Sequence, residues 1–349
     1  MGRTTGPARG RWTPPDWPER IRALARGELT PAVPRRAATV LLLRDTPAPA
    51  GRGGDAGGGL EVHLIRRRTS MAFAGGAHAY PGGGVDPRDE GVPPRVWAGP
   101  GPAEWAARLG TDPASARAIV CAVVRETFEE AGVLLAGGAA GGPAGGGAAG
   151  GEGAGTGIVP DTSGEEWEAD RLALVSRELS FGDFLLRRRL AMRTDLLGAW
   201  ARWITPEFEE RRYDTWFFVA ALPAGQRTRQ ASTESDRALW LTPGAALRGY
   251  EAGEMLMMPP TVATLRRLAG HRTVAAALAA AAARPAAAEP VLARVRPATA
   301  ADGTGELVVS WPGHAEFEYR IPRTGPGPGT RNGTRNGTRT RTGKEGPRP

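Results

Sequence analysis

The stretch that most constrains this chain is Arg125-Glu126-Thr127-Phe128-Glu129-Glu130-Ala131-Gly132-Val133. At 100° per residue, Glu126, Glu129 and Glu130 share about 100° of helix surface, and Phe128 falls on the opposite, apolar side. Three like charges within one turn repel each other unless a cation lies among them. Oxygen ligands at this density suit a hard ion such as Mg²⁺ or Mn²⁺. The stretch therefore predicts a metal-binding helix that ends at Gly132. The alternative is an ordinary solvated acidic face.

A glycine-rich turn lies upstream, at Tyr80-Pro81-Gly82-Gly83-Gly84-Val85-Asp86-Pro87-Arg88-Asp89. Together the two segments resemble the halves of the Nudix box, in which a glycine is followed six positions later by an acid and then by REUxEExGU. Gly83 matches the glycine, and Asp89 stands where the family prefers Glu. The sequence places 35 residues between Asp89 and Arg125, where the family pattern has seven, so 28 are inserted. Because closure entropy grows only logarithmically with loop length, we expect the chemistry to survive this insertion.

The resemblance to Nudix hydrolases implies a role for each part of the box. Arg125 is expected to point away from the acidic face and to pair with a carboxylate that fixes its position. Backbone amides of the glycine turn let the chain approach metal and phosphates closely. The expected site consists of metal ligands Glu126, Glu129 and Glu130, catalytic residues Glu129 and Arg125, and cofactor-binding residues Gly82, Gly83 and Gly84.

The general base stays open between a box glutamate and a downstream acid. Glu234 lies six residues before Trp240, where many Nudix chains place an extra ligand, but it is equally well an exposed loop acid. Asp236 and Glu207 are weaker candidates. His78 could contact a phosphate, although a hydrogen-bonded structural histidine in the turn is the favoured interpretation.

Two downstream segments indicate which group of Nudix hydrolases the chain resembles. Residues 200–206 (WARWITP) and 211–218 (RRYDTWFF) resemble the Nudix motif 19 group, which also carries a long insertion in its box. The resemblance covers roughly residues 35–320 and implies coenzyme A or an acyl-coenzyme A as substrate. A separate coenzyme A signature of other Nudix enzymes has an arginine eight residues before the aromatic of the turn. That position is Ala72 here, so this signature is absent.

The expected fold is α/β, a Nudix α/β/α sandwich with a mixed sheet, a helical insertion after the box helix and a small C-terminal extension. The buried strands expected at 37–44 and 60–66 precede the box helix, which is expected over 113–131. The predicted organisation is an irregular leader (1–34), a Nudix domain (35–270) with an inserted loop (90–116) and a flexible Gly/Ala linker (136–156), a helix and hairpin extension (271–321), and a disordered basic tail (322–349).

The composition limits which partners and which cellular compartment the sequence predicts. Of the net charge of +8, +6 lies in residues 323–349, so we predict no specific nucleic-acid partner. No apolar run is long enough to span a membrane, and we expect no secretory signal. The single cysteine, Cys121, suits a reducing compartment and favours the cytoplasm. A homodimer is compatible with the sequence.

The predicted function is metal-dependent cleavage of a pyrophosphate bond in a nucleoside diphosphate derivative, with coenzyme A or acyl-coenzyme A favoured. A second enzyme hypothesis is hydrolysis of another dinucleotide or nucleotide sugar, such as NADH, FAD or ADP-ribose. A third is a non-catalytic Nudix module that binds a nucleotide and regulates. The intact carboxylate cluster disfavours this last hypothesis, because a pure sensor needs no metal cluster.

Overall fold

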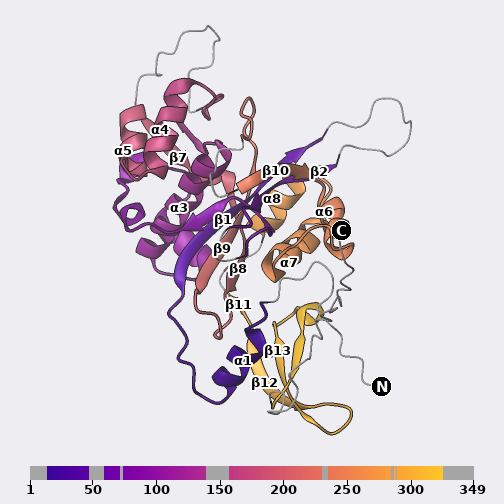
Figure 1. Ribbon diagram of the computed structural model, residues 1–349. Coiled ribbons are helices and arrows are strands. Elements are labelled where there is room, and N and C mark those ends of the chain that lie inside the picture. Colours follow the sequence, from indigo (N-terminus) through magenta and orange to yellow (C-terminus); the bar gives the residue numbers. More distant parts are fainter. Residues whose placement is uncertain are drawn as a thin grey trace, which may run out of the picture.

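A mixed sheet forms the centre of the computed structural model (Figure 1). The structure describes residues 14–46, 59–70, 74–138, 157–229, 235–283, 287 and 289–324. Along the sheet the strands run in the order β10-β2-β1-β9-β8-β11, with β3 beside β2 and β4 beside β1. The strands of this sheet are β1 (Arg35–Asp45), β2 (Leu60–Arg67), β3 (His78–Ala79), β4 (Gly82–Gly84), β8 (Leu197–Ile204), β9 (Tyr213–Ala221), β10 (Ser235–Leu241) and β11 (Val291–Leu292).

The central strand β1 is buried on both faces, as its apolar composition predicts. It pairs in parallel with β9 and antiparallel with β2 and β4. Its side chains alternate between two cores: Val40 and Leu42 belong to one, whereas Leu41 and Leu43 belong to the other. The sheet is therefore covered on both sides, which confirms the predicted α/β sandwich.

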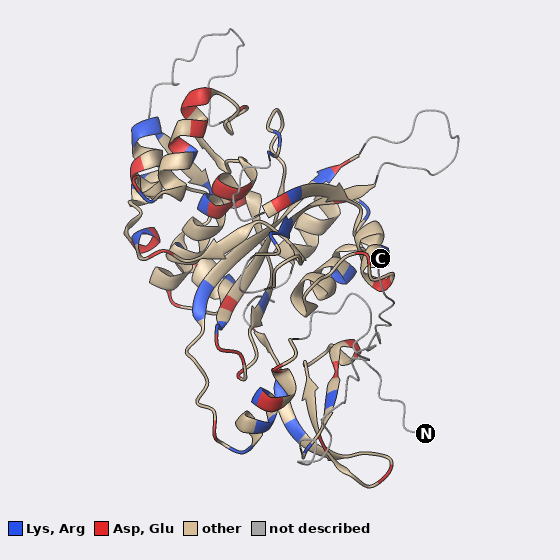
Figure 2. Ribbon diagram, in the orientation of Figure 1, with Lys and Arg blue, Asp and Glu red and all other residues tan. Residues whose placement is uncertain are grey.

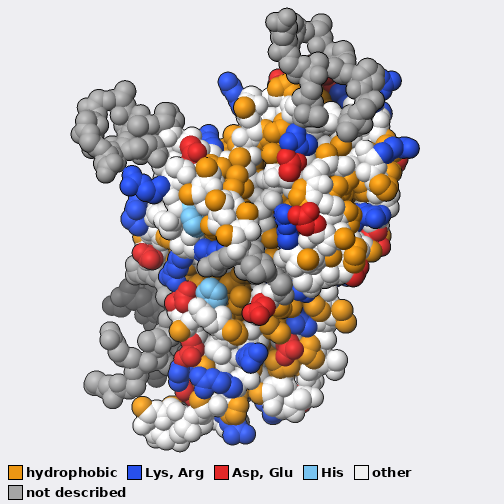
Figure 3. All heavy atoms as spheres, turned by 180° about the vertical axis from the view of Figure 1, so that it is seen from behind, with side chains coloured by type: hydrophobic (Ala, Val, Ile, Leu, Met, Phe, Trp, Pro, Cys, Tyr) orange, Lys and Arg blue, Asp and Glu red, His pale blue; other side chains and the backbone are white. Residues whose placement is uncertain are grey.

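Two groups of helices cover the two faces of the sheet (Figure 1). Apolar residues of α2, α3, α4 and α5 join the first core, and those of α1, α6, α7 and α8 join the second. Figure 2 shows acidic and basic residues interspersed over these helices, and Figure 3 shows charges of both signs among hydrophobic side chains on the rear face. The helices are α1 (Trp17–Ala25), α2 (Pro102–Leu109), α3 (Pro113–Ala131), α4 (Glu165–Val175), α5 (Phe181–Arg188), α6 (Pro243–Glu251), α7 (Pro259–Leu268) and α8 (Val274–Ala282).

The box helix α3 has the predicted limits because both of its ends are fixed locally. The Asp112 carboxylate accepts hydrogen bonds from the amides of Ala114 and Ser115, and Pro113 fits the first helical position. Gly132 ends the helix in the left-handed region at φ +68°, where a side chain would be strained. The last turn of the helix, which carries the three glutamates, therefore lies against β4 of the sheet.

The segment inserted into the box is ordered and helps to build a second sheet. It contains α2 and the short strand β5 (Trp97–Ala98). β5 and β6 (Ala136–Gly138) both pair with β7 (Leu190–Arg193). The prediction of a flexible linker is therefore wrong for 136–138, because cross-strand hydrogen bonds hold these residues; 139–156 lie outside the described residues. A 3₁₀ turn at Pro87–Gly91 includes Asp89 and leads into the insertion, which carries a second 3₁₀ turn at Pro94–Val96.

The leader and the C-terminal extension pack against the same end of the sandwich. Trp17 of α1 is buried and makes edge contacts with Phe208 and Tyr319, at ring-centroid distances of 5.1 and 5.8 Å. The extension is a three-stranded sheet rather than the predicted hairpin, and its last strand starts at Tyr319 because a 3₁₀ turn occupies Ala315–Phe317. Its strands are β12 (Arg294–Thr299), β13 (Gly305–Ser310) and β14 (Tyr319–Pro322). Of the predicted disordered tail, 325–349 lie outside the described residues.

Candidate active site

The carboxylates in the last turn of α3 pack against the glycine turn. The Gly82 amide donates a 2.8 Å hydrogen bond to Oε2 of Glu130. At Gly83, an added Cβ would lie 2.5 Å from Oε1 of Glu126. Helix and turn, the two halves of the predicted box, are therefore in direct contact despite the insertion between them.

The three glycines of the turn play different parts. At Gly82, which has φ +155°, an added Cβ would lie 2.5 Å from the Ala38 carbonyl oxygen on β1. Gly83 faces Glu126 in the same way, so both positions exclude any side chain. Gly84 has open space around its Cα, and it contributes its carbonyl oxygen, which accepts a 2.9 Å hydrogen bond from Nη2 of Arg125. Sequence alone does not separate these roles.

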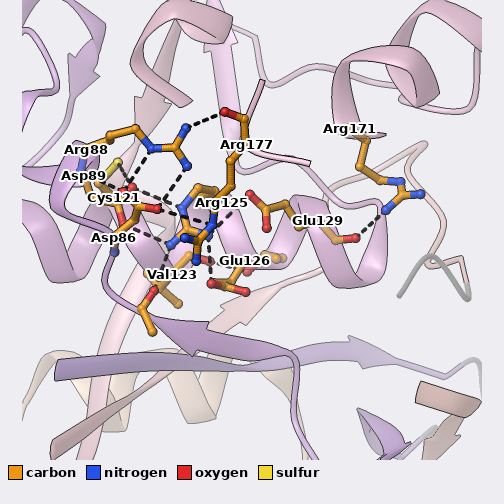
Figure 4. Close-up of polar contacts among 12 residues, drawn as sticks. Asp86, Arg88, Asp89, Cys121, Val123, Arg125, Glu126, Glu129, Arg171 and Arg177 are labelled. Carbon is orange, nitrogen blue, oxygen red and sulfur yellow. Dashed lines mark hydrogen bonds and ion pairs between the residues drawn. The ribbon is translucent and has the colours of Figure 1, made fainter. Parts of the chain in front are cut away.

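Arg125 lies between the acid of the turn and the acids of the helix (Figure 4). Its Nε and Nη2 donate to the two carboxylate oxygens of Asp89, at 3.1 and 3.0 Å. The expected pairing with a carboxylate is present, but the expectation that Arg125 points away from the acidic face is wrong. Its Nη1 donates to Glu126 at 2.8 Å and to Glu129 at 3.3 Å, because the long side chain turns back along the helix. One guanidinium therefore fixes three carboxylates.

The acids of this cluster are crowded and poorly hydrated. Burial raises the pKa of Glu126 to about 7; Arg125 opposes this shift, and the charge of Glu129 adds to it. Burial also raises the pKa of Glu129, against the effect of Arg125. Burial alone would lower the pKa of Arg125, but Glu126 and Asp89 raise it above its ordinary value. Burial therefore disfavours the charged forms of these carboxylates, and a divalent cation would relieve this.

These residues fit a metal by the chemistry of their donors, which are all carboxylate oxygens. Among the described residues, no group of three or more His, Cys, Asp or Glu side chains is already arranged around one point as a ligand set. Glu126 and Glu129 face Arg125, whereas Glu130 faces the Gly82 amide. The metal-ligand assignment of Glu126, Glu129 and Glu130 therefore stays a prediction.

Arg171 of α4 is a positioning residue that the sequence analysis missed. Its guanidinium, which is nearly fully buried, donates to the backbone carbonyl of Glu129 at 2.8 Å (Figure 4). It also donates to the side chain of Glu168. A cation at the end of a helix satisfies free carbonyl groups and complements the helix dipole. Arg171 thus ties the helical insertion to the turn of α3 that carries the acids. No local sequence signal marks this contact, because 42 residues separate the partners.

A cavity of about 780 Å³ opens beside the carboxylates. It is lined by the glycine turn, by the four charged residues in the helical half of the box, and by Arg67 at the end of β2. On one side it reaches Leu172 and Val175 of α4, and on the other it reaches Met258 and the first residues of α7. The cavity thus joins a charged centre to apolar walls, as ligand sites commonly do.

The other acids predicted as candidates lie elsewhere. Glu234 lies outside the described residues. Asp236 forms a two-point ion pair with Arg66, and neither Asp236 nor Glu207 is among the described residues that line the cavity. His78 is buried, and burial lowers its pKa; its backbone amide donates to the Leu256 carbonyl at 2.8 Å. His78 does not line the cavity either, so its geometry favours the structural interpretation.

The sandwich fold and the paired halves of the box define a class. In both respects the chain is similar to the Nudix hydrolases, which are pyrophosphohydrolases. Residues 105–268 match the family model of the NUDT19 Nudix domain. That match includes α3 and the helical insertion after it.

Similar proteins support this assignment along most of the chain. The chain is 29% identical over 273 residues to the Homo sapiens acyl-coenzyme A diphosphatase NUDT19, covering 69% of this chain and 70% of that protein. It is also 29% identical to the Gallus gallus protein of the same name, over 67% of this chain and 68% of that one. Among solved structures, the NUDIX hydrolase from Alicyclobacillus acidocaldarius aligns with a TM-score of 0.54 and 27% identity, over 71% of this chain and 96% of that one.

Proposed function

We propose that this enzyme hydrolyses the pyrophosphate bond of coenzyme A or an acyl-coenzyme A in the presence of Mg²⁺ or Mn²⁺. The products are 3′-phosphoadenosine 5′-phosphate and a phosphopantetheine. The observation that carries the proposal is the cluster of Glu126, Glu129 and Glu130, which lies against the glycine turn and lines a cavity that also has apolar walls. The names of the human and chicken relatives support the choice of substrate.

The metal would be held by the carboxylates of Glu126, Glu129 and Glu130. When bound, it neutralises the charge of the pyrophosphate, which otherwise repels an attacking water. The other contributions to catalysis come from residues of the protein itself. Arg125 holds Glu126 and Glu129 in place, and the amide of Gly82 orients Glu130. Because these acids are fixed before substrate arrives, little reorganisation is needed during the reaction.

A carboxylate must also orient the attacking water and accept its proton. Glu129 is our proposed base, because it lies on the cavity and, among the described residues, only a 3.3 Å hydrogen bond from Arg125 engages its side chain. As the water oxygen bonds to one phosphorus, the bond from that phosphorus to the bridging oxygen breaks, and the proton passes to the carboxylate. Glu234 stays the alternative base.

The apolar wall favours a substrate with a long, uncharged arm. Leu172 and Val175 lie one helical turn apart on α4, and they are unusually exposed for large aliphatic residues, at 52% and 44%. Both line the cavity beside Glu129. A pantetheine or acyl chain could cover them, whereas the second nucleotide of NADH or FAD would place polar groups there.

The test is a panel of coenzyme A, acetyl- and decanoyl-coenzyme A, NADH, FAD and ADP-ribose, incubated with Mg²⁺ or Mn²⁺ and resolved by chromatography. We expect turnover of the coenzyme A compounds. With Leu172→Gln/Val175→Gln, we expect a higher KM for decanoyl-coenzyme A than the wild type shows. Turnover of ADP-ribose or NADH alone would support the second enzyme hypothesis, and binding of all compounds without turnover would support a regulatory module.

The proposal also covers the cellular compartment and the partners of the enzyme. Among the described residues, no helix is both long and apolar enough to cross a membrane. The lone cysteine, Cys121, is free and buried, and burial raises the pKa of its thiol, which suits a reducing cytoplasm. A homodimer and the lack of a specific nucleic-acid partner stay predictions, which light scattering and a binding assay with duplex DNA would test.

A further inference from the structure

Several of the arginines that line the cavity are already engaged by protein groups. Arg125 is engaged by Asp89 and the box glutamates, and Arg171 by Glu168 and a helix carbonyl. Arg88 forms an ion pair with Asp86. Arg36 likewise pairs with Glu90 and Ser115. These four groups therefore have protein acceptors, and only part of their charge is available to a ligand.

Arg67, the last residue of β2, differs from these four. Its Nε–H is buried and has no hydrogen-bond acceptor among the described residues, although the side chain lines the cavity. A buried donor without a partner destabilises the fold, so such groups are rare in folded proteins. Arg67 also has no side-chain hydrogen bond or ion pair to any described residue, so the terminal nitrogens of its guanidinium are available to a ligand in the cavity.

The backbone around Arg67 fixes the direction of its side chain. Its amide donates to the Ala77 carbonyl at 2.9 Å, and its carbonyl accepts from the Gly76 amide at 3.0 Å. β10 pairs with the other edge of β2, with Ser235 opposite Arg67. Because side chains alternate along a strand, Arg67 shares the face of His63, which contacts Trp240 in the core beneath α3. Arg67 therefore lies on the face of the sheet that carries the box glutamates.

We propose that Arg67 binds the pyrophosphate group of the substrate through its guanidinium and thereby sets its position over the carboxylates. This inference rests on the proposed pyrophosphohydrolase function and adds a substrate-binding residue to it. A pyrophosphate brings negative charge next to three carboxylates, so cationic donors must accompany any metal. The planar guanidinium suits this task, since it can donate two parallel hydrogen bonds to phosphate oxygens.

The variants are Arg67→Gln and Arg67→Lys, with Arg68→Gln as the matched control. Arg68 is the next residue, is exposed and does not line the cavity. We expect Arg67→Gln to lower kcat/KM about 10- to 100-fold, the usual effect of losing a hydrogen bond to a charged group. Arg67→Lys should recover part of the loss. Arg68→Gln should match the wild type.

Thermal unfolding separates substrate binding from a structural role. Because Arg67 Nε has no acceptor to lose among the described residues, Arg67→Gln should keep or raise the Tm, whereas a structural arginine would lower it. A lower Tm, or an unchanged kcat/KM on whichever panel substrate the wild type cleaves, would overturn the proposal.

A binding measurement keeps this test separate from the proposed function. Calorimetric titration with ADP and Mg²⁺ should give about 10-fold weaker binding to Arg67→Gln than to the wild type and to Arg68→Gln. If coenzyme A is not cleaved but this difference is found, the substrate assignment fails and the role of Arg67 stands. If coenzyme A is cleaved equally by Arg67→Gln and the wild type, the role of Arg67 fails alone.

Discussion

The Arg125 guanidinium and the Asp89 carboxylate form a buried two-point ion pair, with N–O distances of 3.1 and 3.0 Å. The pair joins residues 36 positions apart and closes the inserted segment onto the box helix. It also sets the position of the guanidinium that holds Glu126 and Glu129. The ion pair therefore keeps the two halves of the box in contact despite the long insertion between them.

Asp89→Asn should test this pair. The substitution keeps the shape but leaves the Arg125 charge without its main partner, and breaking a buried pair costs about 3–5 kcal/mol. Urea denaturation should show a loss of this size, together with lower activity. Asp195→Asn breaks a similar two-point pair with Arg193 in a more exposed setting, and should cost about 1 kcal/mol or less. Equal losses at the two sites would contradict the role given to Asp89.

Gly83→Ala should be far more harmful to activity than Gly84→Ala. A Cβ at Gly83 would lie 2.5 Å from Oε1 of Glu126, whereas a Cβ at Gly84 meets nothing within 4 Å. Displacing Glu126 should cost about 100-fold or more in kcat/KM, since small misplacements of reacting groups have effects of this size. Steady-state kinetics of the two variants decide the point. A loss at Gly84 as large as that at Gly83 would mean that the turn does not approach Glu126 as described.

His63 should make the fold sensitive to acid. Burial, with a smaller contribution from Arg44, lowers the pKa of His63 to about 4. Between about pH 6.5 and pH 4, His63 is protonated in the unfolded chain but neutral in the folded chain. The free energy of unfolding therefore falls as the pH is lowered through this range, by about 3 kcal/mol in total. His63→Phe should remove this component from denaturation curves measured at several pH values. His271→Phe, at a half-exposed site, controls for the loss of an imidazole. An unchanged pH dependence in His63→Phe would refute the assignment.

Divalent cations should stabilise the folded protein through the carboxylate cluster. Mg²⁺ or Mn²⁺ at about one hundred times its Kd should add about 2.7 kcal/mol. Glu126→Gln/Glu129→Gln should abolish this gain in thermal unfolding, while Glu104→Gln, an exposed residue on α2, should keep it. A gain that persists in the double variant would place the cation elsewhere.

Much of the fold was predictable because its signals are local. The caps and glycine stop of α3, the apolar run of β1 and the glycine turn each depend on neighbouring residues, and each lies where it was expected. The second sheet was not predicted, because β5 and β6 are very short strands without a periodic pattern. Its existence depends on pairing with the distant β7.

The site was predictable to the level of residue types but not of contacts. The spacing of Glu126, Glu129 and Glu130 indicated one acidic face, and the family pattern indicated a carboxylate partner for Arg125. The return of Arg125 to that face depends on side-chain packing. The contact of Arg171 with the Glu129 carbonyl depends on elements brought together only by folding, and so does the lack of an acceptor for Arg67 Nε among the described residues.

The most direct measurement compares hydrolysis of coenzyme A by the wild type and by Glu129→Gln in the presence of Mn²⁺, with products identified by chromatography and the Tm recorded for each. The wild type should release 3′-phosphoadenosine 5′-phosphate. Glu129→Gln should lose at least about 100-fold in kcat, the effect expected of a missing general base, with its Tm unchanged or raised because a buried charge is removed. Full activity of Glu129→Gln at an unchanged Tm would contradict the account.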